Sequence, residues 1–179
     1  MAKILVIVDM QHDFIDGSLG SSDAQSILPA VASKIRQRVS DGWEVLITLD
    51  THGKDYLTTQ EGQKLPVPHC IKGTWGWELH PLVEEALKGV PFRIFEKPTF
   101  GSEALTAYLK ETQPEAVEFI GLCTDICVVS NAIAAKMVLL DAQISVDASC
   151  CAGTSPASHQ AALATMASCQ ISITQEVQS

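Results

Sequence analysis

The chain has 179 residues and a net charge of -9 at pH 7, with a pI of about 4.9. This length suits one hydrophobic core better than two, so we expect a single domain over residues 1–179. Nucleic acids and anionic membranes would both be repelled by an acidic surface. We therefore expect a small molecule as the binding partner, with no nucleic acid and no membrane.

Short β-branched runs alternate with segments of helical periodicity along the chain. The expected strands are 4–8, 45–49, 92–95, 117–120, 144–146 and 171–173, and the expected helices are 27–39, 102–111, 126–140 and 156–167. Gly42 should end the first helix. This alternation predicts an α/β fold in three layers, with helices on both faces of a mostly parallel sheet.

The first expected strand and the cysteines indicate the cellular compartment of the protein. Residues 4–8 form too short an apolar run for a signal peptide or a membrane span, which indicates a cytoplasmic protein. Six cysteines stand at positions 70, 123, 127, 150, 151 and 169. Without a secretory signal or a small loop-rich domain, reduced thiols are expected rather than disulfides.

Cys127 lies where a buried strand is followed by a helix. Gly121 permits a sharp turn, and Thr124 or Asp125 can cap the helix. Backbone N–H groups at the start of a helix stabilise negative charge, so we expect the pKa of Cys127 to be lowered. A free cysteine is more often a small buried hydrophobic residue, however, and position alone does not make it a nucleophile.

Reactive side chains follow four consecutive strands. Asp9 ends the first expected strand, Asp50 the second and Lys97 the third, while the fourth leads to Cys127. Taken singly, each aspartate could cap a turn and the lysine could be a solvated charge. Because ligands bind at the carboxyl ends of parallel strands, an acid, a cation and a thiol gathered there predict a catalytic cleft.

Five segments stand in a specific order and spacing along the chain: Val8–Phe14, Asp50–His52, Pro68–Cys70 with Gly73–Thr74, Lys97–Ser102 and Thr124–Val128. In these segments the chain resembles the isochorismatase-like cysteine hydrolases, and most of all the nicotinamidase/pyrazinamidase group. The resemblance implies a six-stranded, Rossmann-like sheet in the order 3-2-1-4-5-6. That order would place Asp9 and Cys127 on neighbouring strands.

The resemblance also implies hydrolysis of a small carboxamide, with nicotinamide as the first candidate. Cys127 would attack the carbonyl and form a thioester, Asp9 would carry protons, and Lys97 would hold the pair. The backbone N–H groups of Cys123 and Cys127 would bind the oxyanion, beside a cis peptide bond between Leu122 and Cys123. No organic cofactor is expected.

A metal site is implied by the same resemblance. Its ligands would be Asp50, His52 and His69, with Glu61 as the candidate for the fourth, and the metal would hold the pyridine nitrogen of the substrate. Carboxylate and imidazole ligands suit zinc first, with iron or manganese as alternatives. An Asp-x-His pair by itself is weak, since such residues commonly cap turns. His80 is expected only to open a helix near Pro81.

The substrate wall departs from the family pattern. Phe14 matches one wall of the family's pocket, but Pro66 stands where nicotinamidases commonly carry an aromatic residue. Trp75 and Trp77 could line the pocket, the core or a subunit contact. Family members often self-associate, so a homo-oligomer is expected.

Two alternatives stay open at this point. One is a related cysteine hydrolase that acts on another carbamoyl or ureido amide. The other, of a different class, is a redox or binding protein in which Cys123, Cys127 or the adjacent Cys150 and Cys151 form a reversible disulfide.

Overall fold

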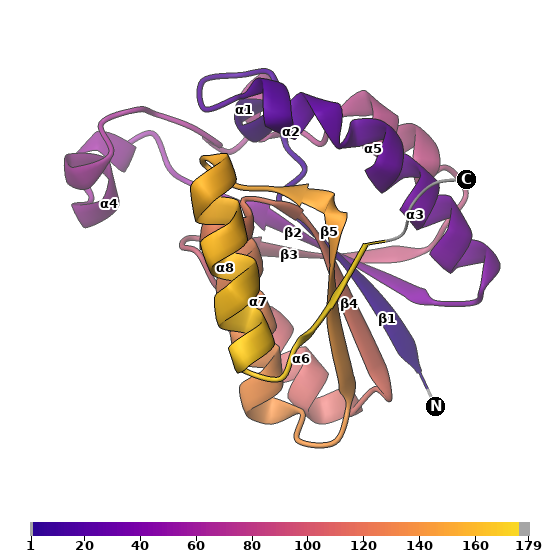
Figure 1. The fold of residues 1–179 in the computed structure, drawn as a ribbon. Coiled ribbons are helices and arrows are strands. Elements are labelled where there is room, and N and C mark those ends of the chain that lie inside the picture. Colours follow the sequence, from indigo (N-terminus) through magenta and orange to yellow (C-terminus); the bar gives the residue numbers. More distant parts are fainter. Residues whose placement is uncertain (1, 176–179) are drawn as a thin grey trace.

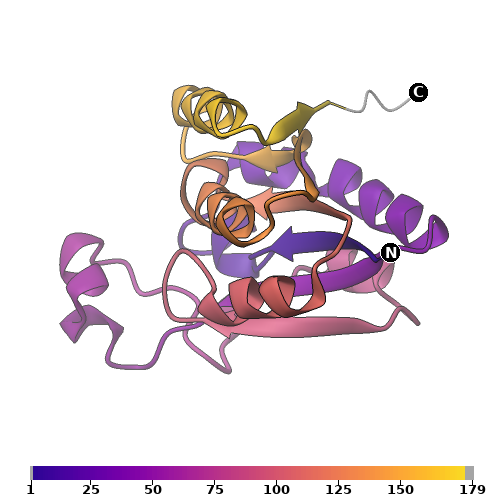
Figure 2. The ribbon, with the colours of Figure 1, turned by 90° about the horizontal axis from the view of Figure 1, so that it is seen from below.

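A six-stranded parallel sheet lies between two layers of helices in the computed structural model, which describes residues 2–175 (Figure 1, Figure 2). The strands are β1 (Lys3–Val8), β2 (Glu44–Asp50), β3 (Phe92–Lys97), β4 (Ala116–Leu122), β5 (Gln143–Ala152) and β6 (Ser172–Thr174). Their spatial order is β3-β2-β1-β4-β5-β6, and every neighbouring pair is parallel. The predicted fold and strand order are confirmed.

The helices fall into two groups (Figure 1). One face of the sheet is covered by α3 (Leu28–Ser40) and α5 (Pro81–Ala86), and the other by α6 (Glu103–Thr112), α7 (Val129–Val138) and α8 (Pro156–Ser168). Short helices α1 (His12–Ile15) and α2 (Ser22–Ser26) follow β1, whereas α4 (Gln60–Lys64) stands away from the sheet on extended connections. Single turns of 3-10 helix span Tyr56–Thr58 and Trp75–Trp77.

The central strands are apolar on both sides because both faces of the sheet are covered. In β1, Leu5 and Ile7 belong to the core under α3 and α5, while Ile4 and Val6 belong to the core under α6, α7 and α8. All four are fully buried. Two cores thus fix β1 and its neighbours, and with them the loops at the carboxyl ends of the strands.

Gly121 has a different role from the one expected. It lies within β4 beside β1 and not in the turn that follows. Its φ is 120°, and an added Cβ would lie 2.2 Å from the carbonyl oxygen of Val8. Glycine is therefore required for the close approach of these two strands.

The segment after β4 also differs from the prediction. A π-helical turn spans Thr124–Val128 and α7 begins only at Val129, so the expected helix from residue 126 starts late. Cys123 is the N-cap residue and makes no side-chain cap. The expected capping by Thr124 or Asp125 is wrong, because these side chains bond to His159 and Thr154 instead.

The end of the first expected helix agrees with the structure. The helix that Gly42 was expected to end is α3, which stops at Ser40, and Gly42 follows with a φ of 80°. All six cysteines are free. Within residues 2–175, no helix has the length and apolar character needed to cross a membrane.

Candidate active site

Lys97 lies at the centre of a charged group at the carboxyl ends of the strands. Its Nζ is 2.6 Å from Oδ2 of Asp9, 3.3 Å from Oδ1 of Asp50 and 3.4 Å from Sγ of Cys127. A further hydrogen bond of 3.0 Å runs from Nζ to the carbonyl oxygen of Thr99. The structure thus brings together the four side chains that the sequence places after four separate strands.

Asp9 is held in place by β2 as well as by Lys97. Its backbone N–H donates to the carbonyl of Thr48 over 3.1 Å, and the Thr48 hydroxyl donates to Asp9 Oδ1 over 2.7 Å. Burial raises the pKa of Asp9, although the charge of Lys97 acts in the opposite direction. Thr48 was not predicted as a site residue. The available signal was a hydroxyl inside an otherwise apolar strand.

The pKa of Cys127 contradicts the prediction of a lowered value. Burial of the thiol raises its pKa well above the ordinary range, the Asp9 carboxylate raises it further, and Lys97 offsets only part. The side chain lies against the apolar core under α7 and is only 4% exposed. Desolvation of the thiolate therefore outweighs the attraction of the Lys97 charge, and the site favours the neutral thiol.

We call residues Cys123–Val128 the Cys127 turn. It begins with a cis peptide bond between Leu122 and Cys123, as the family resemblance implied. The N–H groups of Ile126 and Val128 both donate to the Cys123 carbonyl, over 3.0 and 3.1 Å. Burial also raises the pKa of the Cys123 thiol, to about 12. The two thiols of this turn are therefore both protonated near neutral pH.

Asn131 joins the Cys127 turn to the loop after β3, a contact that the sequence did not reveal. Its Nδ2 donates to the carbonyls of Cys127 and Phe100, over 2.8 and 3.1 Å, and its Oδ1 accepts the N–H of Ser102 over 2.9 Å. Asn131 is buried in α7 and uses both ends of its amide. It therefore keeps the loop that follows Lys97 aligned with the turn that carries Cys127.

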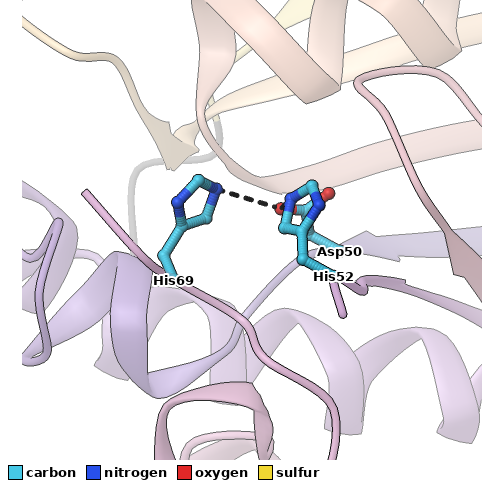
Figure 3. A group of neighbouring side chains, drawn as sticks. All are labelled: Asp50, His52 and His69. Atoms are coloured by element: carbon cyan, nitrogen blue, oxygen red, sulfur yellow. Dashed lines mark hydrogen bonds and ion pairs between the residues drawn. The ribbon is translucent and has the colours of Figure 1, made fainter. Parts of the chain in front are cut away.

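Asp50, His52 and His69 form a second group beside the first (Figure 3). Their ligand atoms lie within 4.8 Å of one another, which is close enough for one metal ion to contact all three. Nε2 of His52 is 2.9 Å and Nε2 of His69 is 3.4 Å from Oδ2 of Asp50. A hydrogen bond of 2.8 Å between His69 Nδ1 and the Val67 carbonyl turns Nε2 toward the group.

Asp50 thereby belongs to both groups. Burial alone would raise its pKa, but hydrogen bonds with His52 and His69 and the charge of Lys97 bring the pKa far below the usual range. The pKa of His69 is raised in turn, because its hydrogen bonds with Asp50 and Val67 outweigh burial. Asp50 is therefore an ionised carboxylate, as a metal ligand must be.

Glu61 reaches the same group from α4. Its Oε1 lies 3.7 Å from Nε2 of His52 and 3.8 Å from Nε2 of His69. The hydroxyl of Thr59 caps the helix by accepting the N–H of Gly62 over 3.0 Å. The structure thus places Glu61 on the open side of the three buried residues.

A cavity of about 400 Å³ opens above both groups. Its polar lining includes Asp50, Glu61, His69 and the two cysteines of the Cys127 turn, and its apolar lining includes Phe14, Leu19, Leu65, Phe100, Leu122 and Ile126. The ring of Phe14 lies 5.6 Å from that of His69. Of these apolar residues the sequence indicated only Phe14, since the others come from several separate segments, among them the end of β4 and the Cys127 turn, and share no periodic pattern.

The tryptophans and His80 have other roles. Trp75 is 55% exposed and stacks on His12 at 4.0 Å, while Nε1 of Trp77 donates to the Thr51 hydroxyl over 2.9 Å. The cavity wall contains neither tryptophan, and Leu65 contributes to it next to Pro66. His80 caps α5 through Nδ1, which accepts the N–H of Leu82 over 3.2 Å, as predicted.

Comparison with known proteins agrees with this fold. The model of the isochorismatase domain matches residues 3–177. The chain is 30% identical to the isochorismatase family protein PncA of Bacillus subtilis, in a match that covers 74% of this chain and 78% of that protein. It is 27% identical to the nicotinamidase/pyrazinamidase of Mycobacterium tuberculosis, in a match that covers 81% of this chain and 89% of that protein.

Among solved structures, the pyrazinamidase/nicotinamidase of Streptococcus mutans superposes with a TM-score of 0.86 at 29% identity. The match covers 97% of this chain and the whole of that one. Together with the domain match over nearly all of its length, this similarity shows that the chain belongs to the isochorismatase family.

Proposed function

We propose that the protein is an amidohydrolase that converts a small carboxamide to its acid and ammonia, with nicotinamide as the expected substrate. The observation that carries this proposal is the buried Lys97 ammonium, which contacts both the Asp9 carboxylate and the Cys127 thiol beside the cavity. The names of the relatives from Mycobacterium tuberculosis and Streptococcus mutans support this choice of substrate.

Asp9 is suited to carry the proton. Its pKa is raised by burial, which brings a carboxyl group closer to the working range of an acid and base near neutral pH. As Cys127 Sγ bonds to the carbonyl carbon, its proton passes to Asp9. When the C–N bond breaks, Asp9 returns this proton to the leaving nitrogen, so ammonia departs and a thioester remains.

Hydrolysis of the thioester uses the same carboxylate. Asp9 takes a proton from water, the oxygen bonds to the acyl carbon, and the departing sulfur recovers a proton as the acid leaves. Lys97 stays charged throughout: burial opposes its charge, but the neighbouring Asp9 and Asp50 carboxylates raise its pKa above the ordinary lysine value. We assign the oxyanion to the backbone N–H groups of Cys123 and Cys127, both of which belong to the Cys127 turn.

The residues beside this centre fit a divalent transition metal. One carboxylate and two imidazoles are a common donor set, and His69 presents Nε2 because Nδ1 bonds to a backbone carbonyl. Asp50, His52 and His69 would hold the ion, with Glu61 alongside. Zinc is the expected ion, with iron or manganese as alternatives. When bound, it supplies a Lewis-acid site for a ring nitrogen of the substrate.

An ammonia-release screen tests the proposal. The panel contains nicotinamide, pyrazinamide and a set of carbamoyl and ureido compounds, and Cys127→Ala serves as the blank. Cys169→Ala, which removes an exposed thiol, is the matched control and should keep full activity. We expect nicotinamide to be turned over and the blank to be inactive. Full activity of Cys127→Ala would refute the mechanism.

The same screen separates the alternatives. Turnover of an acyclic amide with no turnover of pyridine carboxamides would replace the substrate while retaining the mechanism. If no amide is cleaved but oxidation shifts the electrophoretic mobility, and Cys123→Ser abolishes that shift, the protein is a thiol redox protein instead. Self-association stays a prediction, and sedimentation of the purified chain tests it.

A further inference from the structure

A partly buried hydrogen bond outside the reacting groups connects the Cys127 turn to α8. Thr124 Oγ1 and Nδ1 of His159 are 2.7 Å apart. Thr124 is fully buried in the turn, and His159 lies in the first turns of α8, about thirty-five positions further along the chain. The bond thus crosses from the segment after β4 to the segment after β5.

A second tie runs in parallel with the first. The Asp125 carboxylate accepts the N–H of Thr154 over 2.9 Å and the hydroxyl of the same residue over 2.5 Å. The two segments also pack closely, since a Cβ added to Gly153 would lie 2.8 Å from the backbone nitrogen of His159 and 2.9 Å from Oδ1 of Asp125. Thr124 and Asp125 are therefore both held by residues 153–159, which we call the β5–α8 segment.

The conformation of the Cys127 turn is expected to depend on these hydrogen bonds. It is a single π-helical turn, a conformation that is rare and that usually needs support from its surroundings. Thr124 comes directly after Cys123, and Cys127 follows three residues later. A shift of Thr124 would therefore move the thiol and both backbone N–H groups that we assign to the oxyanion.

We propose that His159 is a positioning residue for hydrolysis, which acts through the Thr124 hydroxyl to hold the Cys127 turn in its reactive geometry. This inference rests on the proposed amidohydrolase function. His159 itself does not touch the reacting atoms. It lines a separate small cavity beside Asp23 and Cys151, whereas Cys127 faces the larger one.

The variants are chosen to remove the bond with little change in volume. Thr124→Val replaces the hydroxyl by a methyl group, and Thr124→Ser restores a hydroxyl at the same position. His159→Phe removes the ring nitrogens while keeping a planar ring. Thr165→Val is the matched control, because the hydroxyl of Thr165 on α8 bonds only within its own helix, to the Ala161 carbonyl over 3.0 Å.

We expect a loss in kcat rather than in binding. A misplaced catalytic group costs up to about 100-fold, so Thr124→Val and His159→Phe should each lower kcat about 10- to 100-fold, with KM changed less than about threefold. The kcat of Thr124→Ser should stay within about threefold of the wild-type value, and the kcat of Thr165→Val should equal the wild-type value. The double variant Thr124→Val with His159→Phe should be no slower than the slower single variant, because both changes remove one bond.

Alkylation provides a readout that needs no amide substrate. The rate at which iodoacetamide labels Cys127, followed by mass spectrometry of its peptide, should fall at least about fivefold in Thr124→Val and recover in Thr124→Ser. If the wild type releases no ammonia yet labelling follows this pattern, the positioning role stands and the proposed function fails. The positioning role itself is overturned if Thr124→Val keeps both kcat and labelling rate, or if the losses of the two single variants multiply in the double variant.

Discussion

Replacing Lys97 by methionine would leave a buried carboxylate without its cation. The Lys97 and Asp9 side chains are 1% and 0% exposed, and their charged atoms are 2.6 Å apart. Removing one partner of a buried ion pair typically costs about 3 to 5 kcal/mol. Asp50 keeps its hydrogen bonds with His52 and His69, so the destabilisation comes from the unpaired Asp9 carboxylate. Because Thr48 still donates to Asp9, we expect the lower end, about 3 kcal/mol at alkaline pH.

The loss should depend on pH in a defined direction. Burial raises the pKa of Asp9 and Lys97 opposes this, so removing Lys97 raises the folded-state pKa further. A carboxyl group whose pKa is higher in the folded than in the unfolded state favours folding when protonated. This contribution is present below the ordinary carboxyl pKa and disappears as pH rises through the folded-state value. The loss of folding stability in Lys97→Met, relative to the wild type, should thus be smallest near pH 4 and largest near pH 8.

Urea unfolding of four proteins measures this effect: the wild type, Lys97→Met, Asp9→Asn and the double variant. The double variant should be more stable than Lys97→Met at about pH 8, because no charge is left unpaired. Lys72→Met is the matched control, since Lys72 also lies 2.6 Å from a carboxylate, that of Glu96, but this pair is exposed and should contribute less than about 1 kcal/mol. The reasoning is refuted if Lys97→Met lowers the free energy of unfolding no more than Lys72→Met does. It is also refuted if the double variant is no more stable than Lys97→Met.

Three further predictions concern the thiol, the cavity and the metal group. Because burial raises the pKa of Cys127, its labelling by iodoacetamide should keep rising with pH through about pH 9; a plateau below neutral pH would show an activated thiolate instead. Phe14→Ala should raise KM for nicotinamide about tenfold by removing an apolar wall, whereas Trp75→Ala, outside the cavity, should leave KM unchanged. Glu61→Gln should weaken zinc binding about 10- to 100-fold in competition with a chelator, and unchanged affinity would remove Glu61 from the ligand set.

Sequence reasoning located the reactive residues because their positions follow from a local rule. Apolar runs end at Asp9, Asp50 and Lys97, and the carboxyl ends of parallel strands lie at one edge of a sheet. The convergence of these residues on Cys127 therefore needed only the strand ends and a parallel sheet. The five matching segments added the strand order and the cis peptide bond before Cys123, both of which the structure has.

Other parts of the site depend on contacts between distant segments. The contribution of Thr48 requires β1 and β2 in register, and the apolar wall from Leu65 and Ile126 requires the end of α4 to lie near the Cys127 turn. Such pairings leave no periodic signal in the chain. The loss of capping by Thr124 and Asp125 has the same origin, because their partners lie about thirty residues away in the β5–α8 segment.

The sequence by itself thus determined which chemical groups gather at the edge of the sheet, since strand boundaries are local properties of the chain. Only the tertiary structure decided their ionisation. A helix start after a strand predicted a lowered pKa for Cys127, but the burial of its thiol, and the placing of the Asp9 carboxylate beside it, raise that pKa instead. Desolvation depends on everything that surrounds a group, and no short stretch of sequence contains that information.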